Sequence, residues 1–467
     1  MIRVFLCLFM IMGSTWAHAQ LKYTLRYTEN TRPYVTVSIE PATPLPSPVQ
    51  FIMPRSIPGS YSIARYDLFL DSIVAINSQG RRIPMTRHSM DAPRWEYKGQ
   101  DGALLRIEYR VNIDKMERQN TPSDASLLRP GFAGILNYSV FGWIEGVDRE
   151  PVECRVETGS DWPVFSTNAP SVDLASGSLV FREDDYPALA DGQIFMGPRF
   201  RVKSYPGKMP LYVVSYSQTM DEYLGDYGSM GVECMGILDN YFGELPFPHY
   251  TLVLSKALQP DGRVAPAFAM EHRNSSTFFG DTSGLQTVPL TPDLRSRRIN
   301  GILHHMAHAY IPLRSYAGKY QPRPLEIPPL IETIWMNEGF AWFLLYDVLR
   351  QPRLLELFRT SVYETAPEIK TLSLFDLSYL ASTMYAVDFR TGRAVFSRGA
   401  LMALEMDARI RSQTGGKKGM KDVLRYIYHY AKTNPLPIPV EQLPVLMSRA
   451  SGVELGDIYR KWLGKVE

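Results

Sequence analysis

The chain has 467 residues, of which 45% are hydrophobic and 21% are charged. This composition is typical of a globular protein with room for two or three domains of ~100–200 residues each, and it excludes a disordered chain or a coiled coil. The 50 basic residues nearly balance the 48 acidic ones, so the net charge of +2 creates no field that would attract nucleic acid or an anionic membrane surface.

The first twenty residues have the pattern of a targeting segment. Arg3 precedes an apolar stretch from Val4 to Met12 that is too short to cross a bilayer, and the run Ala17 to Ala19 has the small-x-small pattern of a cleavage site. We expect residues 1–19 to be a signal peptide and the exported chain, periplasmic or secreted, to begin at Gln20. The alternative is an N-terminal anchor helix. No later segment is apolar enough to predict a membrane span.

Residues 20–205 predict a β domain, of the sandwich type. Short runs that alternate with a period of two, such as Tyr34 to Ile39 and Leu105 to Val111, are separated by Gly, Pro, Asn and Asp. The 35 prolines and 27 tyrosines of the chain also favour many turns and aromatic strands. No cluster of catalytic type is recognisable in this half of the sequence.

Residues 206–467 predict a mainly helical domain, so the whole chain predicts a multidomain α+β protein. The residues Tyr250 to Ser255 are a strand candidate, and the proline-rich stretch 320–329 excludes a helix or a central strand. Apolar residues recur at helical intervals in the remaining segments, namely 220–242, 301–310, 334–349, 397–410, 422–430 and 448–463.

Two cysteines, Cys154 and Cys234, lie outside the expected signal peptide. An exported compartment permits a disulfide between them, and two separate buried thiols are the alternative. Two cysteines are too few for a zinc ribbon or a disulfide framework.

The residues with chemical potential lie in one stretch. His304 and His308 are four residues apart, so on a helix both imidazoles lie on one face and can reach one divalent ion. Glu338, within a second predicted helix, is the expected third ligand, with the fourth position open to water. Such a histidine pair alone is a weak signal, and the alternative is a polar helix face without metal.

Five segments together resemble the glycyl aminopeptidase family of zinc metallopeptidases, distant relatives of thermolysin and aminopeptidase N. Many members of that family carry a C-terminal PDZ domain, and this sequence ends about where that domain would begin, so we expect none here. The resemblance covers nearly the whole expected mature chain, in order and in rough spacing. The segments are 57–61 (IPGSY), 270–275 (MEHRNS), 304–308 (HHMAH), 335–339 (WMNEG) and 397–401 (SRGAL).

The resemblance implies a thermolysin-like catalytic domain and a role for each matching residue. His304, His308 and Glu338 match the ligands of one zinc ion. Glu271, followed by His272, matches the segment that meets the free amino group of the substrate, which implies peptide N-termini as binding partners. The alternative for Glu271 is an exposed glutamate at a strand edge.

Two departures from the family pattern concern catalysis. His305 stands where the family has the glutamate that acts as general base, and loss of such a base typically costs ~10²–10⁴ in rate. Phe396 stands at the position of a tyrosine that donates to the developing oxyanion, and loss of one such donor costs ~10²–10³. Tyr379 and Tyr385 are candidates to replace that donor.

The departures leave three hypotheses open. In the first, the protein is an exported pseudopeptidase that keeps the metal and a peptide groove but is catalytically weakened or inactive. In the second, it is an active zinc metallo-aminopeptidase that releases small N-terminal residues (Gly or Ala), with His305 or another group as base. In the third, it is a metal-free relative that keeps only the fold.

Overall fold

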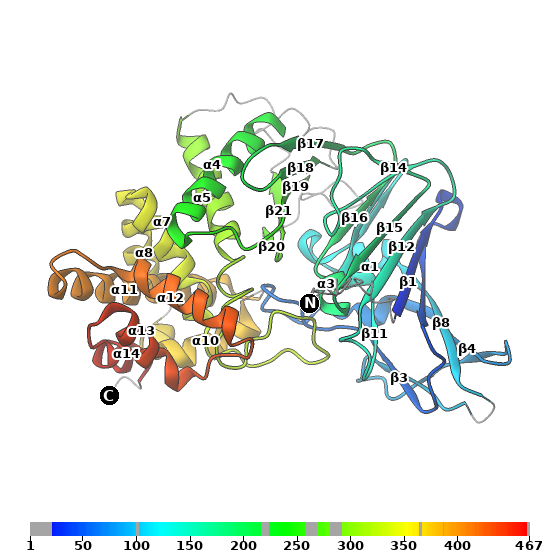
Figure 1. The fold of residues 1–467 in the computed structure, drawn as a ribbon. Helices are drawn as coiled ribbons and strands as arrows, with labels where there is room; N and C mark the ends of the chain where they lie inside the picture. Colours follow the sequence, from blue (N-terminus) through cyan, green and yellow to red (C-terminus); the bar gives the residue numbers. More distant parts are fainter. Residues whose placement is uncertain are drawn as a thin grey trace, which may run out of the picture.

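The computed structural model describes residues 21–467 except 100–101, 216–223, 257–268, 281–291, 364–366, 386 and 465–467. The expected signal peptide, residues 1–19, lies outside this described part. Within it, no helix combines the length and the apolar character that crossing a membrane requires. A β-rich N-terminal part precedes a helical part, as the sequence predicts for a multidomain α+β protein (Figure 1).

Three sheets build the N-terminal part. In spatial order, the largest consists of β15 (Ser178–Glu183), β12 (Val152–Thr158), β1 (Leu21–Tyr27), β2 (Tyr34–Pro41), β8 (Leu104–Asn112), β4 (Leu70–Asn77) and β5 (Arg82–Pro84). The second consists of β14 (Ala175–Ser176), β13 (Pro163–Ser166), β16 (Gln193–Met196), β10 (Phe132–Leu136) and β9 (Leu127–Arg129). The third consists of β11 (Trp143–Ile144), β3 (Val49–Ile52), β7 (Arg94–Tyr97) and β6 (Thr86–Arg87).

The alternating residues of the sequence lie on opposite faces of the largest sheet, and one face is buried. In β1, every second side chain from Leu21 to Tyr27 is buried, and its antiparallel partner β2 buries Val35, Val37 and Ile39. These side chains share one core with the other two sheets, because successive residues of a strand point to opposite faces. Three short helices complete this part, namely α1 (Ile113–Gln119), α2 (Asn137–Val140) and α3 (Tyr186–Ala190).

A fourth sheet lies between the N-terminal sheets and the helices (Figure 1). Its first strand directly precedes the predicted domain boundary at 205/206 and pairs with the next strand along the chain. The boundary itself stays a prediction. Five strands make up this sheet, in the order β17 (Arg201–Tyr205), β18 (Leu211–Ser215), β19 (Tyr250–Lys256), β21 (Ser275–Gly280) and β20 (Met270–Glu271).

The helical part contains the predicted helices, with changes at their ends; residues 220–223 of the predicted helix 220–242 lie outside the described residues. The predicted helix 448–463 is wrong as one unit, because Gly452 adopts φ +74 and ends the first of two helices there. The helices are α4 (Leu224–Phe242), α5 (Pro292–Ala307), α6 (Ile334–Asn337), α7 (Gly339–Leu349), α8 (Pro352–Tyr363), α9 (Pro367–Lys370), α10 (Leu374–Met384), α11 (Phe389–Gln413), α12 (Met420–Thr433), α13 (Leu443–Ser451) and α14 (Gly456–Leu463).

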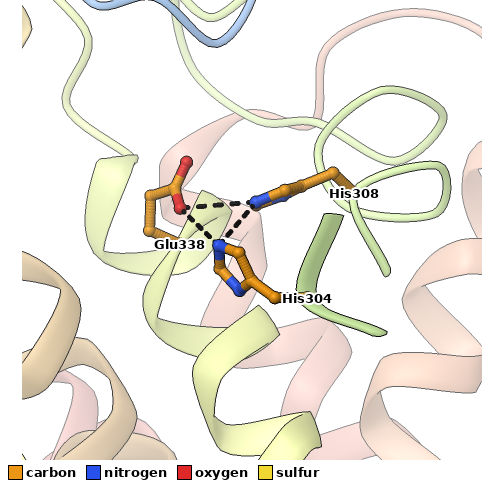
Figure 2. Close-up of side chains that lie close together, drawn as sticks. All are labelled: His304, His308 and Glu338. Carbon is orange, nitrogen blue, oxygen red and sulfur yellow. Dashed lines mark hydrogen bonds and ion pairs between the residues drawn. The ribbon is translucent and has the colours of Figure 1, made fainter. Parts of the chain in front are cut away.

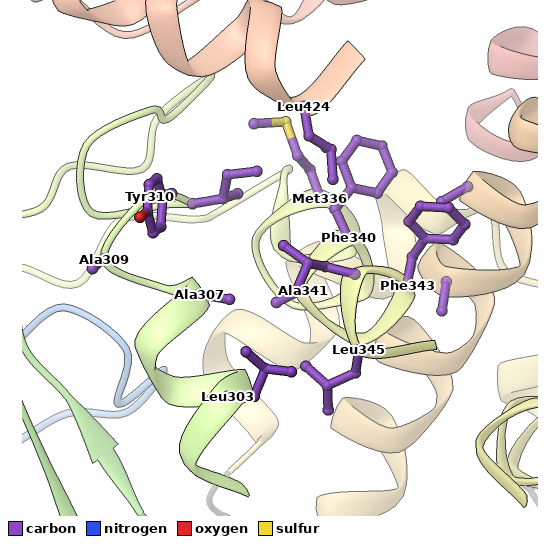
Figure 3. Close-up of a cluster of buried hydrophobic side chains, with 14 of the residues drawn as sticks. Leu303, Ala307, Ala309, Tyr310, Met336, Phe340, Ala341, Phe343, Leu345 and Leu424 are labelled. Carbon is purple, nitrogen blue, oxygen red and sulfur yellow. The ribbon is translucent and has the colours of Figure 1, made fainter. Parts of the chain in front are cut away.

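An apolar core holds α5 against α6 and α7. Leu303 and Ala307 of α5 are buried in the same core as Phe340 and Ala341 of α7, as Figure 3 shows. Because residues three and four apart share a helix face, these apolar positions leave the adjoining face of α5 for the histidines. The core therefore sets the distance between the two helices that carry the candidate metal ligands.

The two cysteines are buried and unbridged in the structure. Cys154 belongs to the N-terminal core, and Cys234 belongs to the helical core. The alternative of two separate thiols therefore holds.

The N-terminal and helical parts are joined by direct contacts. Asp191 accepts from the Tyr138 hydroxyl (2.6 Å) and from the backbone amide of Arg273 (2.7 Å), and it lies 3.0 Å from His272 Nδ1. The proline-rich stretch is neither helix nor central strand, as predicted, and its Leu325 carbonyl accepts a backbone hydrogen bond from the N-terminal part. These contacts hold the β-rich part against the strands and helices of the candidate site.

Candidate metal centre and cavity

Three buried side chains converge at the end of α5. His304 Nε2 and His308 Nε2 lie 3.1 Å apart, and each lies 3.4 Å from Oε2 of Glu338 (Figure 2). Among the described residues, these three form the group that could hold a metal ion. The structure thus brings together the two predicted histidines and the predicted glutamate.

The geometry of this triad fits a tetrahedral zinc ion. Zinc ligands at ~2.0–2.2 Å from the metal lie about 3.3–3.6 Å from one another, close to the observed separations. His308 Nδ1 lies 2.9 Å from the Ile311 carbonyl, which can only accept, so Nδ1 carries a proton and Nε2 is the ring nitrogen that faces the triad. Two nitrogens and one carboxylate oxygen are also the donor types that zinc prefers.

The negative charges of nearby carboxylates make the centre of the triad a favourable place for a positive charge. Burial opposes protonation of His308, but the carboxylates of Glu338 and Glu271 outweigh it and raise the pKa of His308 to about 9. Burial, followed by the charge on His308, lowers the pKa of His304 to about 4. Burial would raise the pKa of Glu338, but His308 and His304 outweigh it and hold that carboxyl well below its ordinary value. Glu338 is therefore an anion.

Glu338 stands at the junction between α6 and α7. Its amide donates to the Ile334 carbonyl and its carbonyl accepts from Trp342, so the helix continues across the junction predicted within 334–349. The next residue, Gly339, lies so close to Gly399 of α11 that an added Cβ would stand 2.6 Å from the Gly399 Cα. Glycines at these two positions let α11 pack closely against the α6–α7 junction, where Glu338 lies.

The N-terminal part contributes a residue that the sequence did not indicate. The Tyr61 hydroxyl donates to Oε1 of Glu338 (2.8 Å), and its side chain packs in the helical core. The N-terminal part thus adds one side chain to the candidate site. Tyr61 belongs to the segment 57–61 that carries part of the resemblance, but no periodicity or spacing connects it to Glu338.

Glu271 faces the metal triad from β20. It is 5% exposed, and His305 Nδ1 lies 3.4 Å from its Oε2. Burial would raise the pKa of Glu271, but the charge on His308 and the contact with His305 outweigh it and lower that pKa. The alternative of an exposed strand-edge glutamate does not hold, because Glu271 lines the cavity described next.

A cavity of about 540 Å³ opens over the triad. Residues of α5, of the strand of Glu271 and of the N-terminal part line it. Phe396 and Tyr385 both line it, with ring centroids 5.7 Å apart. Tyr379 does not line it, and its ring faces Lys319 instead. Tyr385 is thus the candidate donor that reaches the cavity.

His272 does not contact this cavity. Its ring is fully buried, lies 3.2 Å from the Gln193 side chain and stacks on Tyr138, in addition to its contact with Asp191. This placement does not support the predicted substrate contact of His272, because the residue directly follows β20 and its ring faces the N-terminal part, whereas Glu271 faces the cavity.

Comparison with known proteins gives a family match for the N-terminal part. Residues 22–198 match the Peptidase M61 N-terminal domain. A search of curated proteins returns no significant match.

Solved structures share the fold over nearly the whole chain. An aminopeptidase N family protein from Idiomarina loihiensis is similar with a TM-score of 0.79 and 19% identity, over 96% of this chain and 76% of the other. The M1 zinc metallopeptidase from Deinococcus radiodurans is similar with a TM-score of 0.55 and 14% identity, over 96% and 94%. A variant of the latter, solved with a Tyr-Ser-Ala substrate, has a TM-score of 0.53 and 14% identity over 96% and 94%.

Proposed function

We propose that this chain, a zinc metallopeptidase family member by its N-terminal domain and its fold, is a pseudopeptidase that binds one zinc ion and the N-termini of peptides but is catalytically weakened or inactive. The observation that carries the proposal is that the residue after His304 is a histidine, His305. The metal triad is assembled, yet His305 stands where the family has its general base, and it lies against Glu271.

In this proposal, His304, His308 and Glu338 hold the zinc ion. When bound, zinc would act as a Lewis acid that polarises a peptide carbonyl. The fit of the donor set and the direction of His308 Nε2 toward the triad support the assignment.

Glu271 is proposed to receive the ammonium group of the peptide. A buried carboxylate attracts a cation strongly, and a charge-assisted hydrogen bond would favour a chain end over an internal amide. The carboxylate lines the same cavity as the triad, which supports one ligand reaching both. The Tyr-Ser-Ala complex of the structurally similar Deinococcus enzyme agrees with a short peptide in a site of this fold.

Two features argue against efficient hydrolysis. His305 is 3.4 Å from Glu271, so this contact directs its Nδ1 toward Glu271. Phe396, at the position of the oxyanion donor, carries no hydroxyl. Because these groups act as a unit, their losses do not add, and together they correspond to on the order of 5 kcal/mol of transition-state stabilisation.

Elemental analysis and a peptidase assay test the proposal together. We expect about one zinc per chain, lost in a His304→Ala/His308→Ala variant, together with saturable binding of Gly- and Ala-leading peptides. Peptides with an acetylated N-terminus are the matched ligand control and should bind more weakly. Wild-type hydrolysis should be negligible, and His305→Glu should raise it by ~10²–10⁴ if the remaining site is competent.

The results separate the candidates. No zinc after incubation with excess metal would refute both metal hypotheses and leave the metal-free relative. Efficient zinc-dependent release of Gly or Ala by the wild-type protein would instead support the second candidate, an active zinc metallo-aminopeptidase. The observation that favours this candidate is that His305 and Tyr385 both line the cavity, as a base and a hydroxyl donor would need to.

Export to the periplasm or the medium is part of the proposal, from the pattern of residues 1–19 alone. Mass spectrometry of the protein purified from its source compartment tests it. A mature N-terminus at Gln20 is expected, and an intact Met1 in the cytoplasmic fraction would contradict it.

A further inference from the structure

The connection between β3 and β4 contains a loop, residues 57–61, that leaves one core and enters the other. Ile57 and, beyond the loop, Ala64 are buried in the core of the N-terminal part. Tyr61 is buried in the core of the helical part. In the opposite direction, Met270 of β20 packs into the N-terminal core. The two parts thus exchange side chains beside the metal triad.

The loop contacts both carboxylates of the site. Gly59 has φ +81 and lies so close to Glu271 that an added Cβ would clash with its carboxylate. Tyr61 has φ +45, a conformation that costs a non-glycine residue on the order of 1–3 kcal/mol and persists only where its surroundings impose it. The backbone at both positions is therefore held in shapes that bring it against Glu271 and Glu338.

The two carboxylate oxygens of Glu338 have different partners. Oε1 accepts the phenolic hydrogen at 2.8 Å, whereas Oε2 faces the two histidine nitrogens. A carboxylate oxygen can only accept, so the phenol is the donor here. Without this hydrogen bond, either oxygen could turn toward the histidines.

We propose that Tyr61 is a positioning residue of the metal site, whose hydroxyl holds Glu338 Oε1 and so presents Oε2 to the ion shared with His304 and His308. The inference rests on the zinc site proposed above and deepens it, since it makes the N-terminal part a contributor to metal affinity. A hydrogen-bond partner behind a metal ligand typically changes metal affinity by ~10–100-fold.

The test compares Tyr61→Phe with the wild-type full-length mature chain. Phenylalanine keeps the ring that packs edge-on against Tyr385, at 5.9 Å, and removes the hydroxyl alone. Zinc affinity is measured by competition with a chromophoric chelator, and the cobalt-substituted protein is measured by visible absorption. We expect zinc to bind ~10–100-fold more weakly and the cobalt spectrum to change, because the coordinating oxygen is no longer fixed.

The matched control is Tyr23→Phe. The Tyr23 hydroxyl is also buried in the N-terminal part and donates to the Gly142 carbonyl at 3.1 Å, far in sequence from the site. Both variants lose one buried hydrogen bond, so the metal-free forms should show similar decreases in Tm. Only Tyr61→Phe should change zinc affinity and the cobalt spectrum.

The outcomes distinguish the inference from the function on which it rests. If the wild-type protein binds zinc and Tyr61→Phe binds it within about twofold with an unchanged cobalt spectrum, the positioning role is refuted and the zinc site stands. If the wild-type protein binds no zinc, the proposed function fails and the inference fails with it. If Tyr23→Phe loses as much zinc affinity as Tyr61→Phe, the loss is explained by general destabilisation. That outcome would also refute the positioning role of Tyr61.

Discussion

The Tyr61 hydroxyl donates to Oε1 of Glu338 at 2.8 Å across 277 positions of the chain. One residue comes from a loop of the β-rich part and the other from the junction of two helices. Because the bond crosses between the two parts, the metal triad depends on their docking as well as on the helices that carry it. The predictions below test this dependence and the catalytic departures.

A hydroxyl at position 396 should increase hydrolysis only when a base is present. Phe396 lines the cavity, so Phe396→Tyr in the His305→Glu background should add up to ~10²–10³ in kcat, and less if Tyr385 already donates. Initial rates with Gly- and Ala-leading peptides measure the effect. Phe389→Tyr, which adds a hydroxyl on the same helix, is the control. Equal gains from both substitutions would contradict a specific role for position 396.

Gly399→Ala should destabilise the helical part. An added Cβ would clash with the Trp335 carbonyl and would stand 3.1 Å from the Gly339 Cα, so α11 must move away from the α6–α7 junction. We expect a loss of about 1–3 kcal/mol in the free energy of unfolding, measured by denaturant titration. Zinc affinity should also fall, because Glu338 lies at that junction.

Gly236→Ala is the matched control for this substitution. Gly236 also lies within a helix, α4, but an added Cβ meets no atom within 4 Å. Alanine there should stabilise the protein by about 0.5–1 kcal/mol, because it lowers the entropy lost on folding. A free energy of unfolding for Gly399→Ala that is as high as that of Gly236→Ala would refute the close-packing argument.

Asp191→Ala should weaken the junction between the two parts. The substitution leaves the hydroxyl of Tyr138, the His272 ring and the amide of Arg273 without their shared acceptor. We expect a loss of about 3–5 kcal/mol in the free energy of unfolding and a broader or split denaturation transition, followed by tryptophan fluorescence. The exposed Asp173 supplies the control, and Asp173→Ala should leave the transition unchanged. A single transition at the wild-type midpoint for Asp191→Ala would count against the role of this contact.

Glu183 should make the stability depend on pH. Burial raises the pKa of this carboxyl to about 7, against an ordinary value of 4.5. The folded state therefore holds a proton that the unfolded state releases, and this contribution to stability is complete below pH 4.5 and is lost as the pH rises through 7. Relative to Glu183→Gln, the wild-type protein should lose about 1–2 kcal/mol between pH 4.5 and 8 after allowance for screening.

Denaturant titrations of both proteins across that pH range measure the difference. Glutamine keeps a carbonyl that can accept from Asn168 Nδ2, as the carboxylate does at 2.8 Å. A difference in unfolding free energy that stays constant from pH 4.5 to 8 would contradict the raised pKa.

Local patterns in the sequence predicted many of the elements, and together with the family resemblance they indicated the core of the candidate site. The period of two in the N-terminal part predicted its strands, and the four-residue spacing of His304 and His308 predicted that both imidazoles share one helix face. Glu338 was found through its flanking residues. These predictions succeed because strand and helix periods are properties of consecutive residues, so the sequence records them directly.

The remaining features of the site arise from contacts between distant residues. Neither the Tyr61–Glu338 bond nor the 3.4 Å approach of His305 to Glu271 has a periodic signal, and the burial of His272 depends on Asp191 and Gln193 of the other part. The pattern of consecutive residues indicates whether a segment is a helix or a strand. It does not indicate which other segment packs against it. The candidate ligands could thus be predicted from the sequence, whereas the residues that contact them from the other part became visible only when the two parts were packed together.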